Sequence, residues 1–141
     1  MKLKQYQVFF IIAVLLAITT ACGFSVSTAN IQNAYTARYI NEEPEETTAF
    51  SQDAIFYAIV DLANAPDDTI TKAIWYAVDA EGVEPNLYIS EAEITHGDGT
   101  LTFDLGNDYL WPLGTYKVEL YLNDELDKTL DFSVSVEPAN S

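Results

Sequence analysis

The sequence predicts an all-β protein in which two sheets pack face to face as a sandwich. From Phe50 onward, apolar residues recur at every second position in short runs, which is the period of a strand with one buried face. Clusters of Gly, Pro, Asn and Asp separate these runs and favour turns. No stretch after Cys22 carries an apolar stripe of helical period with capping residues. About seven short strands in one chain of this size are typical of a two-layer sandwich.

The first half of the chain contains three of the expected strands. One parity of residues 31–40 is apolar, which indicates an edge strand: Ile31, Tyr35, Ala37 and Tyr39. Residues 54–62 are rich in aromatic and β-branched side chains and stop at the turn sequence of residues 64–68. Residues 70–79 alternate strictly, with Ala73, Trp75 and Ala77 on one face and Lys72, Ile74 and Tyr76 on the other.

The second half continues the pattern. Residues 87–95 alternate weakly and could instead form a short helical connection. They precede the glycine-rich residues 96–99, so we expect a hairpin with a strand over residues 101–105. Residues 115–122 alternate again, and residues 130–136 form the last strand. The expected inward residues of these last two strands are Tyr116, Val118, Leu120, Leu122, Leu130, Phe132, Val134 and Val136.

Two short patterns narrow the type of sandwich. The sequence Gly114-Thr115-Tyr116-Lys117-Val118 resembles the tyrosine corner of immunoglobulin-like domains. The resemblance implies that the Tyr116 hydroxyl bonds back to the preceding loop and that Val118 occupies a core position. Trp75 resembles the core tryptophan of such domains, with Ile59 or Val60 as its partner on the preceding strand. With Cys22 as the sole cysteine, the chain is similar to the fibronectin-like and bacterial relatives that lack the disulfide.

A wider resemblance covers residues 50–136. Its landmarks are the sequences of residues 50–56, 65–69, 73–76, 111–116 and 132–134. Together they resemble a class of bacterial surface lipoproteins with one immunoglobulin-like module. This resemblance implies a fold and a location, and it implies no catalytic residues.

The first residues predict export and anchoring. Lys2 and Lys4 precede an apolar run over residues 8–18, which is too short to span a bilayer and is typical of a signal peptide. Ile18-Thr19-Thr20-Ala21-Cys22 resembles the lipobox of bacterial lipoprotein precursors, which implies cleavage after residue 21 and attachment of fatty acyl chains such as palmitate to Cys22. We therefore expect a lipid-anchored protein on the extracytoplasmic face of the cell membrane or the outer membrane. The alternative is an ordinary secretory signal cleaved after Ala21.

Domain organisation and charge follow from these assignments. We expect a signal peptide over residues 1–21, a lipidated cysteine, tether and possible edge strand over 22–48, the sandwich over 49–137 and a tail over 138–141. The chain has a net charge of −16, and removal of Lys2 and Lys4 would leave four basic against 22 acidic residues. Nucleic acid is therefore excluded as a partner, because phosphate binding needs clustered Lys and Arg.

The candidates for chemistry are few. His96 is the sole histidine and lies in a turn sequence, so a zinc site or a nucleophile with a histidine base is not expected. Calcium takes six to eight oxygen ligands, and the acidic turns that could supply them contain Asp98, Asp104, Asp108, Asp124 and Asp127. None fits an EF-hand loop, and solvated turns explain them without a bound ion. We expect no enzymatic activity and no cofactor, with calcium as the one candidate ion.

Tyrosines supply the candidate binding surface. Tyr57, Tyr76 and Tyr121 alternate out of phase with the core positions or lie beside them, so they could form an exposed stripe that binds a partner. The alternative is cross-strand packing that stabilises the sheet. Trp111 precedes the tyrosine corner and is expected to close one end of the sandwich. The sequence thus predicts a non-catalytic binding module with an envelope protein as partner and no identified small-molecule ligand; the alternative is a carbohydrate- or calcium-dependent adhesive module.

Overall fold

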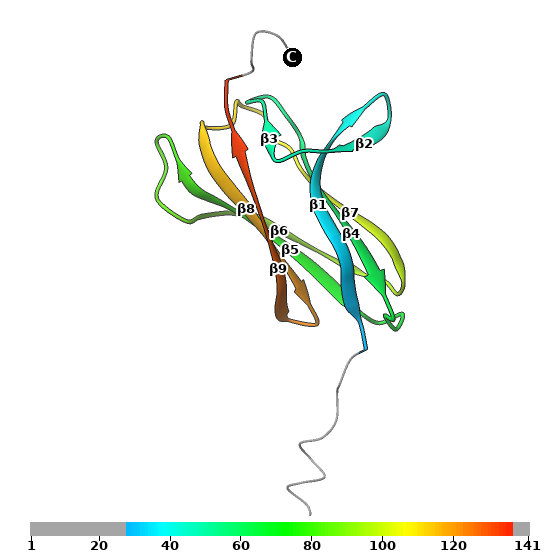
Figure 1. Cartoon of the computed structure of the whole chain (residues 1–141). Helices are drawn as coiled ribbons and strands as arrows, with labels where there is room; N and C mark the ends of the chain where they lie inside the picture. Colours follow the sequence, from blue (N-terminus) through cyan, green and yellow to red (C-terminus); the bar gives the residue numbers. More distant parts are fainter. Residues whose placement is uncertain (1–27, 137–141) are drawn as a thin grey trace, which may run out of the picture.

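The computed structural model describes residues 28–136 as two β-sheets packed face to face, with no helix among these residues (Figure 1). The all-β, two-sheet prediction is confirmed. The predicted signal peptide, Cys22 and the tail lie outside the described residues. The strands are β1 (Asn30–Ile40), β2 (Glu43–Glu46), β3 (Ala49–Phe50), β4 (Phe56–Ala63), β5 (Ile70–Ala80), β6 (Leu87–Thr95), β7 (Gly99–Leu105), β8 (Gly114–Leu122) and β9 (Glu125–Val134).

The strands divide into a four-stranded sheet and a five-stranded sheet. Sheet A has the order β2-β1-β4-β7, and sheet B has the order β3-β9-β8-β5-β6. Neighbouring strands are antiparallel except for the short parallel pair of β3 with β9. β6 and β7 therefore each end a sheet, and each leaves one row of backbone groups without a strand neighbour.

Strict alternation predicts the burial of the central strands correctly. Ala73, Trp75 and Ala77 of β5 are buried, while the residues between them are half-buried on the outer face of sheet B. β8 behaves in the same way, with Val118 in the core and opposite Trp75 in the register. Val60, not Ile59, shares the core with Trp75, because Ile59 has the opposite parity on β4 and lies on the outer face of sheet A.

The centre of the core is a group of rings that we call the interior aromatic cluster, consisting of Phe50, Phe56, Trp75, Trp111, Tyr116 and Phe132. Phe56 stacks on Trp111 with ring centroids 4.5 Å apart and meets Phe132 edge-on at 4.8 Å. The indole nitrogen of Trp111 donates a hydrogen bond to the Ala54 carbonyl at 2.9 Å. Trp111 thus closes the end of the sandwich, as its place in the sequence predicted.

The tyrosine corner forms as the resemblance implied. The Tyr116 hydroxyl donates a hydrogen bond to the Pro112 carbonyl at 2.6 Å, and the side chain is 1% exposed. Burial raises the pKa of Tyr116 to about 12. Gly114 starts β8 at a φ of 149°, where a Cβ would collide with the Asp79 carbonyl, so glycine is required for the close approach of β8 to β5.

The expected hairpin between residues 87–95 and 101–105 is wrong. β6 pairs with β5 in sheet B, whereas β7 pairs with β4 in sheet A, so the chain crosses from one sheet to the other between them. The crossing is fixed to the turn after β4: the Ala65 amide donates to the Asp98 carboxylate at 2.6 Å, and the His96 amide donates to the Thr69 carbonyl at 2.9 Å. The strand character of residues 87–95 is confirmed, and the helical alternative is wrong.

The predicted strand boundaries at the two ends of the domain also differ from those in the structure. Residues 43–46 and 49–50, assigned to the tether and the domain start, form β2 and β3, and a two-residue turn of left-handed Asn41 and Glu42 returns the chain to β1. A bulge after Ile31 reverses the parity of β1, so Ile31 faces the core while Tyr35, Ala37 and Tyr39 lie on the outer face of sheet A. β9 ends at Val134, and Val136 is 67% exposed beyond it.

Candidate functional site

The outer face of sheet B carries two of the three predicted tyrosines. Tyr76 on β5 and Tyr121 on β8 both point outward, and Tyr88 on the edge strand β6 joins them, with its ring 6.2 Å from that of Tyr76. We call this surface the tyrosine face and define it as Lys72, Tyr76, Tyr88, Glu91, Lys117, Glu119 and Tyr121. Tyr88 is the most open of its tyrosines, at 50% exposed.

Tyr57 is not part of this surface. It lies on β4 in sheet A, where its ring centroid is 4.5 Å from that of Tyr39. Because the two sheets pack face to face, the outer face of sheet A is on the opposite side of the molecule from the tyrosine face. The single stripe expected from the sequence is thus divided between two surfaces, since parity within a strand does not tell which sheet the strand joins.

Lysines cover the tyrosine rings. The Lys117 ammonium lies 5.0 Å from the ring centroid of Tyr76, and the Lys72 ammonium lies 5.5 Å from that of Tyr121. Both distances are in the range of a cation–π contact. Lys117 also lies 3.3 Å from the Glu119 carboxylate, whose side chain is only 14% exposed. Their aliphatic parts and the rings therefore form one packed outer layer on sheet B.

Carboxylates hold the tyrosine hydroxyls. The Tyr121 hydroxyl donates to Glu119 at 3.0 Å, and the Tyr88 hydroxyl donates to Glu91 at 3.0 Å. These hydrogen bonds favour the neutral hydroxyl and raise the pKa of Tyr88 and of Tyr121, while burial and then the charge of Glu119 raise the pKa of Tyr76. The face therefore offers neutral aromatic donors next to fixed negative charge.

Five members of this surface were not among the predicted binding residues, and Lys72 is one of them. The other four are Tyr88, Glu91, Lys117 and Glu119. The alternation of β8 places Lys117 and Glu119 on the face of Tyr121, but it does not show that they contact the tyrosines. Tyr88 could not be placed because a bulge in the pairing of β6 with β5 shifts its parity. The remaining predicted residues, Trp75, Tyr116 and Val118, lie in the core.

Side chains of the acidic turns bond to backbone amides and to Lys72. Asp98 accepts from Ala65, Asp124 pairs with Lys72 at 3.7 Å, and the Asn123 side-chain oxygen accepts from the Ile70 amide at 3.0 Å. Asp104 lies opposite Tyr57 on sheet A. Within residues 28–136, no group of three or more His, Cys, Asp or Glu side chains is placed to hold a metal ion.

The described part of the chain likewise contains no helix of the length and apolarity needed to cross a membrane. Neither a protein-family model nor a curated protein sequence matches the chain.

Solved structures are similar in fold. An immunoglobulin-like protein of Pseudomonas aeruginosa superposes with a TM-score of 0.51 and 14% identity, over 79% of this chain and all of that one. A β-glucosidase of Listeria innocua matches at 0.50 and 15% identity, over 80% of this chain and 17% of the enzyme. The alkylpurine DNA glycosylase AlkC of Pseudomonas fluorescens matches at 0.52 and 11% identity, over 78% of this chain and 31% of that protein.

Likenesses at such identities concern the fold and carry no activity from one protein to another. Together with the tyrosine corner and the arrangement of the two sheets, they show that this chain carries an immunoglobulin-like β-sandwich.

Proposed function

We propose that the protein is a membrane-anchored, extracytoplasmic lipoprotein that acts as a non-catalytic binding module, with the tyrosine face as the surface that contacts an envelope protein. The observation that carries this proposal is the gathering of Tyr76, Tyr88 and Tyr121 on one outer face. Tyrosines supply large, rigid contact area with a polar tip, which is why they are enriched in binding surfaces.

The surroundings of these rings support a protein partner. Tyr88 is half exposed and belongs to the edge strand β6, so a partner reaching it also meets unpaired backbone groups of that strand. The excess of 22 acidic over 6 basic residues favours the approach of a positively charged partner. A cation of the partner would compete with Lys117 and Lys72 for the rings and carboxylates that these lysines now cover.

The competing explanation is that the rings only stabilise sheet B. Capture of partners from envelope extracts distinguishes binding from stabilisation. The double variant Tyr76→Ser/Tyr121→Ser is compared with Tyr39→Ser/Tyr57→Ser on the opposite sheet. We expect the first variant to lose a partner that the wild type and the second variant retain. Equal recovery by all three proteins, each verified as folded by circular dichroism, would reject the tyrosine face as a binding surface.

Anchoring is tested separately at Cys22. The variant Cys22→Ser removes the sulfur that the lipobox resemblance assigns to lipidation. We expect it to accumulate uncleaved or to leave the membrane fraction, and to take up no radiolabelled palmitate. Normal labelling of this variant would reject Cys22 as the acylated residue.

A further inference from the structure

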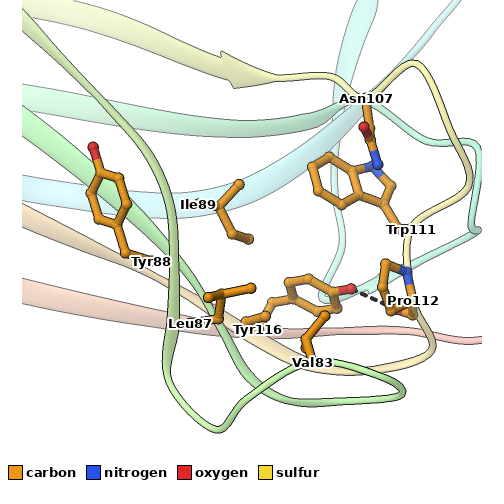
Figure 2. A pocket seen from close by; sticks show the side chains of 9 residues that line it. Val83, Leu87, Tyr88, Ile89, Asn107, Trp111, Pro112 and Tyr116 are labelled. Carbon is orange, nitrogen blue, oxygen red and sulfur yellow. Dashed lines mark hydrogen bonds between the residues drawn. The ribbon is translucent and has the colours of Figure 1, made fainter.

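A cavity of about 300 Å³ opens between the start of β6 and the loop that precedes β8 (Figure 2). Figure 2 shows Leu87 and Ile89 of β6 on one side, facing Trp111 and Tyr116 on the other. The full lining consists of Ala77, Val83, Leu87, Tyr88, Ile89, Asn107, Trp111, Pro112 and Tyr116. Its volume is at the lower end of the roughly 300 to 1,000 Å³ of small-ligand sites, so it suits one side chain or a small molecule.

Exposed apolar residues lie in the lining of this cavity and in the loop next to it. Leu87 and Tyr88 line it and are 38% and 50% exposed, and Tyr109 and Leu110, at 83% and 64%, lie in the loop between the lining residues Asn107 and Trp111. Large apolar side chains left in water around an apolar cavity indicate a contact surface, because their burial by a partner is favourable. The tyrosine corner fixes this loop, since Tyr116 donates its hydroxyl to Pro112.

The two loops that contribute to the cavity carry charge of one sign. The loops that form it, residues 81–86 and 106–113, contain Glu81, Glu84 and Asp108, all exposed, and neither loop contains Lys or Arg. The lining residues are uncharged. An apolar group that enters is therefore best accommodated when positive charge lies beside it and meets these carboxylates at the rim.

The cavity is also well placed for a partner. The register puts the ends of β5 and β7 and the start of β8 at one end of the sandwich, while β1 starts at the other. Figure 1 shows this separation along the length of the two sheets. The described chain begins at the end far from the cavity, so the N-terminal anchor proposed above would hold the opposite end of the sandwich.

We propose that this cavity is a docking site for a protein segment that inserts one aliphatic or aromatic side chain flanked by Lys or Arg. The apolar side chain fills the space between Ile89 and Trp111, and the flanking cations meet Glu81, Glu84 and Asp108. This site goes beyond the proposed function: Tyr88 is the one residue of the tyrosine face in its lining, and either surface could bind without the other.

The two tryptophans provide the readout. Trp111 lines the cavity, whereas Trp75 is 2% exposed in the core, so the full chain labelled with ¹⁵N-tryptophan in non-ionic micelles gives one indole signal that reports occupancy and one that serves as a control. The probe is a capped pentapeptide with one leucine between two pairs of lysines. We expect it to shift the Trp111 signal, and we expect the peptide with alanine at the centre to bind about tenfold more weakly.

Matched variants locate the site. Leu87→Ser should weaken binding of the leucine peptide by about tenfold, whereas Leu126→Ser, at a more exposed leucine on β9, should not. Glu81→Gln/Glu84→Gln should weaken it more than the same charge change at Glu43 and Glu46 of β2. Tyr121→Ser, on the tyrosine face away from the cavity, should bind the peptide normally, which separates failure of this site from failure of the proposed function.

Three outcomes would overturn the proposal. One is the absence of a Trp111 shift at millimolar leucine peptide. Another is equal binding of a peptide in which glutamates replace the lysines. The third is binding of N-acetyl-leucinamide as tight as that of the lysine peptide, which would assign the cavity to a neutral small molecule instead of a cationic segment.

Discussion

The interior aromatic cluster and the tyrosine face both use strands β5 and β8 but differ in nearly every physical respect. Trp75 and Tyr76 are neighbours on β5, yet Trp75 packs among apolar rings while Tyr76 lies under a lysine on the outer face. In the cluster, rings contact rings and the polar tips of Trp111 and Tyr116 bond to backbone carbonyls. On the tyrosine face, the hydroxyls of Tyr88 and Tyr121 bond to glutamate side chains. The first region thus holds the fold together, and the second is the outer surface that we propose for partner binding.

The largest effect is expected at the centre of the interior aromatic cluster. Phe56→Ala removes a ring that stacks on Trp111 and contacts Phe132, so the free energy of unfolding should fall by about 3 to 5 kcal/mol. The control is the adjacent Tyr57→Ala on the outer face of sheet A, where a loss of about 1 kcal/mol is expected. Urea denaturation followed by tryptophan fluorescence measures both. Equal losses at the two positions would contradict the contrast between inner and outer rings.

Alkaline pH should also destabilise the interior aromatic cluster, by less than Phe56→Ala does. Burial raises the pKa of Tyr116 to about 12, against about 10 in an unfolded chain, so the folded state holds this proton more tightly. The associated stability is complete below pH 10 and is lost as the pH rises from 10 to 12. The loss amounts to about 2 to 3 kcal/mol. Unfolding free energies of the wild type and Tyr116→Phe across this range test it: the variant should lack this part of the decline.

Much of the fold could be predicted because alternation reports burial one strand at a time. It gave the inner and outer residues of β5 and β8, and the tyrosine corner located Tyr116 and Val118. Alternation carries no information on which sheet a strand joins, so Tyr57 was grouped with Tyr76, and β6 was paired with β7.

Other features depend on contacts that no local pattern encodes. The acidic β2, with the sequence Glu-Pro-Glu-Glu, has no apolar alternation and is a strand because the turn at Asn41 and Glu42 returns it to β1. The cavity was not predicted either, since Val83, Ile89 and Asn107 come from three separated segments. Its one sequence signal was the apolar Tyr109 and Leu110 within a loop.

A smaller effect is expected from removing single hydroxyls. Tyr116→Phe leaves the buried Pro112 carbonyl without its donor, so it should cost about 1 to 2 kcal/mol at pH 7. Tyr121→Phe removes a similar bond to Glu119, but that carboxylate keeps Lys117 at 3.3 Å, so a change within about 0.5 kcal/mol is expected. Thermal unfolding of the two variants measures the difference. A Tyr121→Phe variant as unstable as Tyr116→Phe would assign the tyrosine face to stability.

The smallest expected effect is that of calcium, and it tests whether the acidic turns bind a metal ion. The Asp98 carboxylate accepts from the Ala65 amide, and Asp124 pairs with Lys72, so both already have partners within the fold. An ion present at 100 times its dissociation constant would raise the free energy of unfolding by about 2.7 kcal/mol and the melting temperature by several degrees. We expect equal melting temperatures in millimolar calcium and in chelator. A carboxylate that only accepts a hydrogen bond from a backbone amide is not stabilised by a divalent cation. A calcium-dependent rise in melting temperature that Asp98→Asn abolishes would therefore favour an adhesive module whose acidic turns bind the ion.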